Sequence, residues 1–353
     1  MNLGTFHAAT DVRSYPYKNV NLLINTVHNA GTPANVKKTK RLMEISAPKH
    51  VMLDSGGSSI YKAEKKGKTI LCNPNLPIYK DSEIKLNLTP DHVINAAIEL
   101  NPDTIVALDF PLQKRNTKDE QEQEFKKKLS KNLQWAEETG KLWANNCPDA
   151  NFLIPIQAKT IDQFEEFMEG LSGLEFTGVS LPYRNLNPKL LVQILIRLWQ
   201  LKIPWVHILG TTSFPYLGIA AYFARQGFFE LVSTDSSSWK ANAIKASAFM
   251  SPHNLLCCQI NEHTAIPDSA RNDCSCPFCR NVSFSDISFD WYSSRSLSLG
   301  CHNAWVTEQV AKDLYKNARS LSQLKHYMMK KGSPNQRVKQ AIKALHLAEN
   351  IKK

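Results

Sequence analysis

The sequence predicts an α/β protein whose parallel strands close into a (β/α)₈ barrel. Short apolar runs of strand length alternate with longer segments of helical period between residues 20 and 260. The long connections imply parallel strands, because a parallel neighbour requires a crossover of a dozen or more residues. The chain has 353 residues and 42% hydrophobic content, so it can bury one large core. An open, doubly wound parallel sheet is the alternative architecture.

The expected strands are separated by segments with recognisable helix starts. Thr89-Pro90-Asp91 and Asn187-Pro188 each place a capping residue and a proline before apolar residues that recur three and four positions apart. This pattern is typical of helices that pack one face against a sheet. The expected strands lie at residues 20–24, 51–53, 104–108, 152–156, 176–181, 205–209, 231–233 and 255–260.

The chain is basic, with 43 lysines and arginines against 32 aspartates and glutamates. A polyanionic partner explains this excess, and solvated helix faces explain it equally well. The basic clusters lie at residues 37–41, 65–68, 126–128 and 330–331.

The chain carries no pattern of an export signal or of a membrane span. Its start lacks a basic flank followed by an apolar run, and no stretch approaches about eighteen uninterrupted apolar residues. We therefore expect a soluble cytoplasmic protein without a membrane partner. In a reducing compartment, the eight cysteines favour metal binding or burial over disulfide bonds.

Polar residues follow the apolar runs at the points where a barrel enzyme carries its active site. Asp54, Asp109 and Asp235 each close or follow an expected strand, and Gln157 follows another. Any one aspartate could simply cap a helix, but three at equivalent positions would repel one another unless each had a partner or a task. The Gly-Gly pair at 56–57 allows close approach of the backbone to a ligand, or forms a tight turn.

A compact cysteine cluster predicts a metal site. Cys274, Cys276 and Cys279 are followed by His302, and three thiolates with one imidazole fill the tetrahedral shell of Zn²⁺. No position is left for water, which makes the zinc structural. Cys301 is an alternative fourth ligand, and chance burial of the cysteines is the non-metal interpretation.

Beyond His302 the pattern is helical to the end of the chain, which suggests an appendix to one barrel. Three helices are expected there, at 303–319, 320–331 and 335–348. The expected parts are a barrel catalytic domain at 1–270, a zinc-binding subdomain at 271–305 and a basic helical extension at 306–353.

These motifs resemble the queuine/tRNA-guanine transglycosylase superfamily. The resemblance covers residues 48 to 305 and rests on Asp-Ser-Gly-Gly after a strand, two later strand-end aspartates and the Cys-x-Cys-x-x-Cys…His signature. It implies a zinc-bearing (β/α)₈ barrel that exchanges one nucleobase for another in nucleic acid. The family's fold and the residue pattern therefore lead to the same expectation.

The resemblance also implies roles for the carboxylates. Asp235 corresponds to the nucleophile that attacks the sugar C1′ and forms a covalent glycosyl-enzyme. Asp54 matches the general acid/base, which needs the more perturbed pKa, and Asp109 matches the acceptor of the guanine N1–H and 2-amino groups. Further base contacts are expected from Gln157, from the backbone of Gly178, and from Ser55 and Gly56.

The chain departs from the tRNA enzymes of the family at two points. Ser58 stands where those enzymes usually carry an aromatic residue over the base, and Tyr61 could substitute from the same loop. After the nucleophile, residues 236–240 read Ser-Ser-Ser-Trp-Lys in place of a Pro-Thr-Arg element that holds the anticodon loop. Trp239 and Lys240 could instead contact a strand with a flipped guanine, although a tryptophan there also suits a core position.

The departures favour the DNA-guanine transglycosylases, which insert a 7-deazaguanine such as preQ0 into DNA. No RNA-binding domain follows the barrel, as one does in archaeal relatives. A tRNA-guanine transglycosylase with an altered recognition loop is the first alternative, and a non-catalytic, zinc-stabilised nucleic-acid-binding protein is the second. Accessory proteins and a homodimer are compatible with each of these functions.

Overall fold

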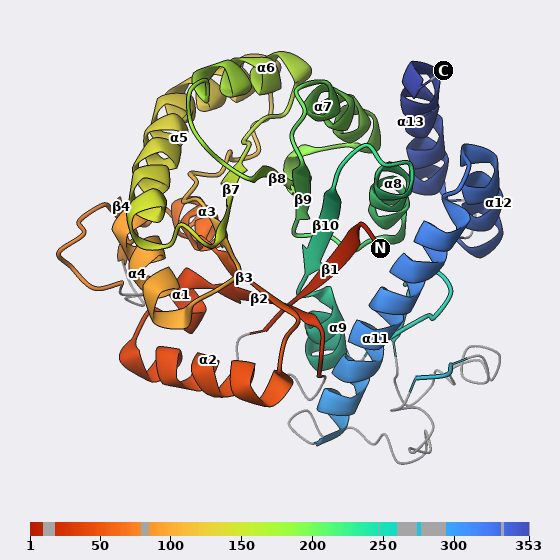
Figure 1. The fold of residues 1–353 in the computed structure, drawn as a ribbon, viewed down its shortest axis with the longest axis horizontal. Coiled ribbons are helices and arrows are strands. Elements are labelled where there is room, and N and C mark those ends of the chain that lie inside the picture. Colours follow the sequence, from red (N-terminus) through yellow and green to blue (C-terminus); the bar gives the residue numbers. More distant parts are fainter. Residues whose placement is uncertain are drawn as a thin grey trace.

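Eight parallel strands form a closed barrel in the computed structural model, which confirms the expected fold class and excludes the open sheet (Figure 1). Around the barrel the order is β1-β10-β9-β8-β7-β6-β3-β2. The structure describes residues 1–9, 18–78, 85–246, 248–259, 274–276, 294–332 and 335–352. The barrel strands are β1 (Leu3–Ala8), β2 (Asn21–Asn25), β3 (His50–Asp54), β6 (Thr104–Val106), β7 (Asn151–Pro155), β8 (Gly178–Pro182), β9 (Trp205–Leu209) and β10 (Leu231–Ser236).

The barrel closes through its N-terminal strand, which the sequence pattern did not reveal. Strand β1 pairs with β10 on one side and with β2 on the other, and Phe6 lies opposite both Asp235 and Asn21. The segment expected to supply the last strand, 255–260, lies outside the barrel, where β12 (Cys257–Gln259) pairs antiparallel with β11 (Ala248–Met250). Gly4, Thr5 and His7 interrupt the apolar character of β1, so only its pairing identifies it as a barrel strand.

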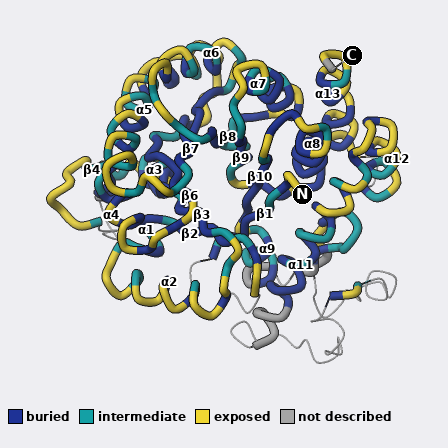
Figure 2. Tube along the Cα trace, viewed as in Figure 1, coloured by how far each residue is buried: buried dark blue, intermediate teal, exposed yellow. Residues whose placement is uncertain are grey.

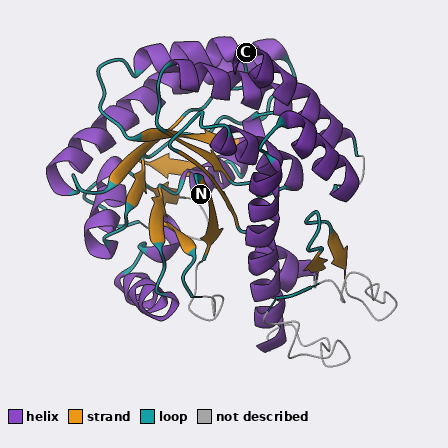
Figure 3. Cartoon of the chain, turned by 45° about the vertical axis from the view of Figure 1, so that its right-hand side comes forward, coloured by secondary structure: helices purple, strands orange, loops and turns teal. Residues whose placement is uncertain are grey.

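Helices surround the barrel and connect its strands (Figures 1 and 3). The predicted helix starts are confirmed, because the Thr89 side chain accepts from His92 N and that of Asn187 from Leu190 N. These helices are α1 (Thr26–Asn29), α2 (Pro33–Ser46), α3 (Gly57–Lys65), α4 (Pro90–Leu100), α5 (Lys118–Asn146), α6 (Ile161–Gly170), α7 (Pro188–Gln200), α8 (Phe214–Arg225) and α9 (Ser238–Ala246), with a 3₁₀ turn η2 (Tyr183–Asn185) and a two-stranded sheet of β4 (Thr69–Leu71) and β5 (Lys85–Asn87).

The core lies between the barrel wall and the inner faces of the helices, while outward faces such as that of α2 are largely exposed (Figure 2). A third, smaller apolar cluster fills the barrel interior. Its fully or nearly fully buried members are Phe6, Leu23, Met52, Val106, Leu153 and Trp205.

Three C-terminal helices cover one side of the barrel (Figure 1). They are α11 (Ser294–Asn317), α12 (Leu321–Lys331) and α13 (Gln336–Lys352), and all three contact α8. This explains why α8 is buried along nearly its whole length. The expected boundary between residues 305 and 306 falls inside α11, so His302 and the start of the extension share one helix. In the part of the chain that the structure describes, no helix is long and apolar enough to cross a bilayer.

Candidate active site and metal cluster

Asp54, Asp109 and Asp235 line one cavity at the carboxyl ends of the barrel strands. The cavity has a volume of about 370 Å³, and Gln157, Tyr61 and Arg184 also line it. A more open groove of about 770 Å³ lies between α2 and α4, but none of the three aspartates reaches it. The structure therefore brings together the three carboxylates that the sequence placed at separate strand ends.

Asp54 is the last residue of β3 and is held by the end of the neighbouring strand. Asn25 Nδ2 donates to Asp54 Oδ2 at 2.6 Å, and Thr26 Oγ1 donates to the Asp54 carbonyl at 3.0 Å. Burial raises the pKa of Asp54 to about 6, with a smaller contribution from Asp235, although the hydrogen bond from Asn25 opposes the shift. A carboxyl group with that pKa can hold or release a proton near neutral pH, as a general acid/base must.

Asp109 follows β6 and lies on the floor of the cavity. Ser55 Oγ donates to its Oδ1 at 3.1 Å and Gln157 Nε2 donates to its Oδ2 at 2.6 Å. Burial raises the pKa of Asp109 to about 7, and the charge of Asp54 adds to the shift. Each carboxylate oxygen can still accept a second hydrogen bond from a ligand.

The Ser55-Gly56-Gly57 turn brings backbone against Asp109. Gly56 has a φ of 96°, a left-handed conformation that favours glycine, and Gly57 begins α3. A Cβ on Gly57 would lie 1.9 Å from Asp109 Oδ1. The absence of a side chain on Gly57 therefore leaves the space that the Asp109 carboxylate occupies. Ser55 is fully buried and contacts Asp109 directly.

Gln157 is oriented by its own neighbours. Its Oε1 accepts from Leu112 N at 3.3 Å and from Asn185 Nδ2 at 3.1 Å, which turns the amide nitrogen toward Asp109. The side chain expected to contact the base thus holds the carboxylate expected to bind the base. The sequence could not show this, because Leu112, Asn185 and Asp109 meet only in the fold.

A buried ion cluster, which the sequence analysis missed, supports the loop after Asp109. The Lys128 side chain is 1% exposed and lies 2.7 Å from Glu124 and 2.7 Å from Glu64, and it donates to the Pro111 carbonyl at 2.8 Å. Burial opposes ionisation of Glu124, but hydrogen bonds from Lys128, Arg115 and the backbone outweigh it and hold its pKa at about 2. The sequence signal was the Glu124–Lys128 pair, four residues apart on one helix.

Asp235 is the fifth residue of β10. Its Oδ1 accepts a hydrogen bond from Gly210 N and lies 3.1 Å from His207 Nε2. Gly210 comes directly after β9, and His207 points into the barrel interior from that strand. Two partners from the adjacent strand therefore fix the orientation of the carboxylate.

Tyr61 and Arg184 form a pair at the cavity. Arg184 Cζ lies 5.4 Å from the centroid of the Tyr61 ring, an arrangement of guanidinium over an aromatic face. Tyr61 comes from α3 and Arg184 from η2, and Ser58 also lines this cavity. Ser58 offers no aromatic ring to cover a bound base, but the aromatic residue Tyr61 lines the same cavity.

Three residues that were expected to contact the base or the nucleic acid do not line the cavity. Gly178 is the first residue of β8, at the opposite end from the cavity, and a Cβ there would lie 2.4 Å from the Trp205 carbonyl oxygen and 2.8 Å from Trp205 Cβ, so the glycine allows close approach of β9. Trp239 is 3% exposed and packs near Gly300 and His7, which leaves no face for stacking on a nucleobase. Lys240 is half-buried on α9 and is absent from the cavity wall.

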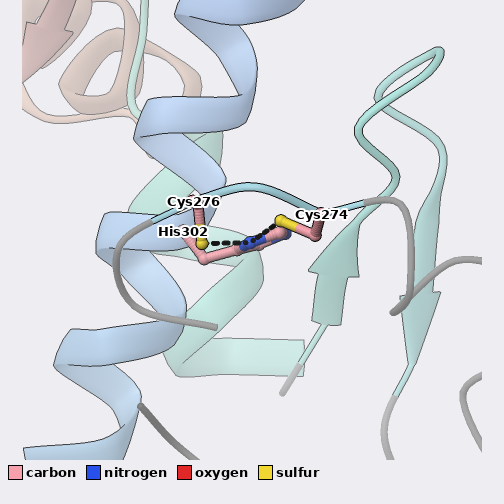
Figure 4. Close-up of side chains that lie close together, drawn as sticks. All are labelled: Cys274, Cys276 and His302. Atoms are coloured by element: carbon pink, nitrogen blue, oxygen red, sulfur yellow. Dashed lines mark hydrogen bonds between the residues drawn. The ribbon is translucent and has the colours of Figure 1, made fainter. Parts of the chain in front are cut away.

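Cys274, Cys276 and His302 form a cluster that could bind a metal ion (Figure 4). Their ligand atoms lie within 4.8 Å of one another, and both sulfurs face His302 Nδ1, at 3.4 and 3.3 Å. His302 Nε2 is 2.9 Å from the Met250 carbonyl, which can only accept, so Nε2 carries a proton and Nδ1 is the nitrogen that faces the thiols. Two thiols and a correctly oriented imidazole suit zinc.

The remaining expected ligands differ in status. Cys279 lies outside the residues that the structure describes. Cys301, the alternative ligand, is buried next to the cluster but is not one of its three members.

One family model matches the chain. Residues 11–182 match the model described as queuine tRNA-ribosyltransferase. The matched segment includes Asp54, Asp109 and Gln157, and it ends before Asp235 and the metal cluster. It supports the superfamily that the motifs resemble and suggests guanine transglycosylase activity. No curated protein matches the chain.

Proposed function

We propose that this protein is a DNA-guanine transglycosylase that replaces guanine in DNA with a 7-deazaguanine base resembling preQ0. The observation that carries the proposal is the convergence of Asp54, Asp109 and Asp235 on one cavity, each with different partners. Carboxyl groups in different environments can take different roles in one reaction. The cavity volume of about 370 Å³ lies within the usual range of small-molecule sites, about 300–1,000 Å³.

In the first half-reaction, Asp235 attacks C1′ of the deoxyribose. The C1′–N9 bond breaks, its electron pair leaves with guanine, and protonated Asp54 gives its proton to the departing base. A carboxylate suits this step because the transition state carries positive charge on the sugar. Asp109 accepts hydrogen bonds from the N1–H and 2-amino groups, which selects guanine-like bases.

In the second half-reaction, the incoming 7-deazaguanine binds in the same place. Asp54, now ionised, takes the proton from the ring nitrogen, and that nitrogen attacks C1′. The C1′–oxygen bond to Asp235 breaks, and its electron pair returns to the carboxylate. Asp235 is then a free carboxylate and Asp54 is protonated, as both were before the first half-reaction.

DNA is favoured over tRNA by the segment after the nucleophile. Ser236, Ser237 and Ser238 follow Asp235, and Ser237 is exposed and lines the cavity. A Pro-Thr-Arg element that holds an anticodon loop has no counterpart there. Transfer RNA is the alternative substrate, because the matched family model is described as a tRNA-ribosyltransferase. Incubation with a labelled 7-deazaguanine and either DNA or tRNA decides between them, since label entering tRNA alone excludes the DNA substrate.

A non-catalytic nucleic-acid-binding protein is the alternative from another class. The enzyme predicts a denaturant-resistant protein–DNA adduct that Asp235→Ala abolishes, whereas a binding protein gives no adduct and binds equally well with Asp235→Ala. Absence of both adduct and exchange with every polymer contradicts the proposed activity. Binding should weaken steeply with salt in either case, because lysine and arginine release counterions from phosphates.

Cys274, Cys276, Cys279 and His302 would hold the zinc ion in this proposal. A closed shell of four protein ligands leaves no site for water, so the ion would link α11 to the segment before it without taking part in the exchange. The orientation of the His302 imidazole supports this assignment.

A further inference from the structure

We propose that His207 is a positioning residue that restrains one oxygen of Asp235 and thereby assigns the attack on C1′ to the other, Oδ2. The inference rests on the proposed function, because it concerns the nucleophile of that reaction. It is carried by a chain of buried hydrogen bonds that runs from Trp205 through Ser233 and His207 to Asp235.

The direction of this chain follows from the chemistry of its members. Trp205 Nε1 can only donate, and it lies 2.8 Å from Ser233 Oγ. Ser233 Oγ lies 2.8 Å from His207 Nδ1, and no other acceptor for its proton is found among the described side chains. The hydroxyl therefore donates to Nδ1, and the ring N–H of His207 is at Nε2.

The opposite tautomer is disfavoured by Asp235. With the proton on Nδ1, the Nε2 lone pair would face a carboxylate oxygen 3.1 Å away. Two acceptors at that distance repel, and both groups are nearly or fully inaccessible to water, which would otherwise screen the repulsion. The His207 N–H therefore points at Asp235 Oδ1.

Packing fixes the His207 ring in this position. Its ring meets Phe6 edge to face, with centroids 5.8 Å apart and planes at 87°. Ser233 is opposite His207 in the β9–β10 register, so the sheet holds the two side chains next to each other. Trp205, the first member of the hydrogen-bond chain, is opposite Gly178 in the β8–β9 register, and a Cβ on Gly178 would collide with the Trp205 carbonyl oxygen and Cβ.

This arrangement distinguishes the two oxygens of Asp235. Oδ1 accepts from both His207 and Gly210 N, whereas Oδ2 receives no hydrogen bond from any residue placed in the structure. An oxygen with two donors has less electron density to offer an electrophile. Oδ2 therefore forms the bond to C1′, and Oδ1 becomes the carbonyl oxygen of the glycosyl ester.

The same two donors act again when the intermediate breaks down. As the C1′–Oδ2 bond breaks, its electron pair returns to the carboxylate and negative charge grows on Oδ1. Fixed donors stabilise such charge without reorganisation. Loss of the His207 donor should therefore slow adduct decay, and it should slow adduct formation because Asp235 is no longer held in one orientation.

The test compares His207→Leu with His207→Gln. Leucine removes the donor, and we expect it to lower kcat about 10²-fold, the usual effect of losing one such donor, with KM changed less than about threefold. Glutamine can place an N–H near Nε2 and should recover at least about tenfold of the loss. His50→Leu is the matched control, because His50 is in the same interior but is paired with Thr104 Oγ1 at 2.7 Å.

The outcomes separate the inference from the function. An adduct that forms with the parent but forms and decays at the same rates in His207→Leu overturns the inference alone. An equal loss of activity in His50→Leu also overturns it, since general disruption of the interior would then suffice. No adduct with the parent overturns the proposed function instead.

A spectroscopic measurement covers the case in which His207→Leu does not fold. Nitrogen-15 NMR of histidine-labelled parent protein should show a neutral His207 with the proton on Nε2 and a hydrogen-bonded Nδ1, assigned by comparison with His207→Gln. Ser233→Ala should move the Nδ1 resonance. A cationic ring at pH 7, or a proton on Nδ1, contradicts the proposed chain.

Discussion

Gly57 is packed so closely against Asp109 that a side chain at position 57 would displace the Asp109 carboxylate. A Cβ at position 57 would lie 1.9 Å from Asp109 Oδ1 and 2.7 Å from its Cγ. The backbone after β3 thus forms a wall of the pocket around the carboxylate that we assign to base recognition. The two strand-end motifs, Asp-Ser-Gly-Gly and Asp109, are parts of one structure.

Gly57→Ala should therefore abolish base exchange. The new methyl group must push Asp109 away from Ser55 and Gln157, and we expect kcat/KM to fall at least about 10²-fold, since misplacement by about 1 Å can cost that much. Gly67→Ala is the control, because Gly67 also has a positive φ, 67°, but nothing lies within 4 Å of its Cβ position. That variant should lose about 1 kcal/mol of stability and retain exchange.

The rate of exchange should depend on pH with a narrow, bell-shaped profile. Asp109 must be ionised to accept from guanine, which requires a pH near or above its pKa of about 7, whereas Asp54 must be protonated to assist the leaving base, which fails above its pKa of about 6. Because the two groups interact, the limbs of kcat/KM belong to the pair. A profile that is flat between pH 5 and 8 contradicts these roles.

The same pKa shifts predict how stability depends on pH. Both folded-state pKa values are raised above that of an unfolded aspartate, about 4. Ionisation of the two groups therefore costs stability above about pH 7, and the cost disappears as the pH falls toward about 4. Their combined contribution can be measured as the difference between urea unfolding of the parent and of Asp54→Asn/Asp109→Asn at pH 8 and at pH 5.

Lys128→Met should destabilise the protein by about 3 kcal/mol, the lower end of the cost of breaking a buried ion pair, because the buried Glu124 then keeps only the partly exposed Arg115 as a charged partner. Lys126→Met is the matched control on the same helix, since Lys126 is 55% exposed in its pair with Glu166 and should contribute at most about 1 kcal/mol. Urea unfolding at pH 7 measures both. Equal effects of the two substitutions would mean that the buried cluster does not hold the loop of Asp109.

Tyr61 should stabilise the bound base by stacking. Tyr61→Ala should weaken binding of a free 7-deazaguanine by about 1–3 kcal/mol, the usual contribution of one aromatic platform, whereas Tyr61→Phe keeps the ring and should bind like the parent. Arg184→Ala removes the guanidinium over the ring and should have the smaller effect. Calorimetric titration measures all three, and unchanged binding in Tyr61→Ala excludes the stacking role.

Zinc should be lost when its ligands are changed. Metal analysis of purified Cys276→Ser and His302→Ala should show less than stoichiometric zinc, and both should melt at lower temperature, because the ion joins Cys274 and Cys276 to α11. Cys147→Ser is the control, since Cys147 ends α5 and is outside the cluster. Stoichiometric zinc in both ligand variants contradicts the assignment.

The sequence by itself determined the class of fold and indicated the residues of the candidate site. Apolar periodicity identifies seven of the eight barrel strands, because buried parallel strands are short apolar runs bounded by helices. The aspartates at 54, 109 and 235 are recognisable for the same reason, since the chain becomes polar where a strand leaves the core. Cysteine spacing likewise indicates a candidate metal site without reference to the fold, and the structure brings Cys274 and Cys276 together with His302.

Tertiary structure alone decided which groups support those residues. Strand β1 was missed because its barrel position depends on pairing with β10 and β2, and such pairing leaves no local pattern. The sequence is compatible with Trp239 either stacking on a base or packing in the core, and only the fold shows that α11 covers it. The family resemblance implied a base contact at Gly178, but the register places this residue at the start of β8, at the end of the barrel away from the cavity and opposite Trp205. Burial, pKa shifts and hydrogen-bond chains such as Ser233–His207–Asp235 join residues far apart in sequence, so they exist only once the barrel has closed.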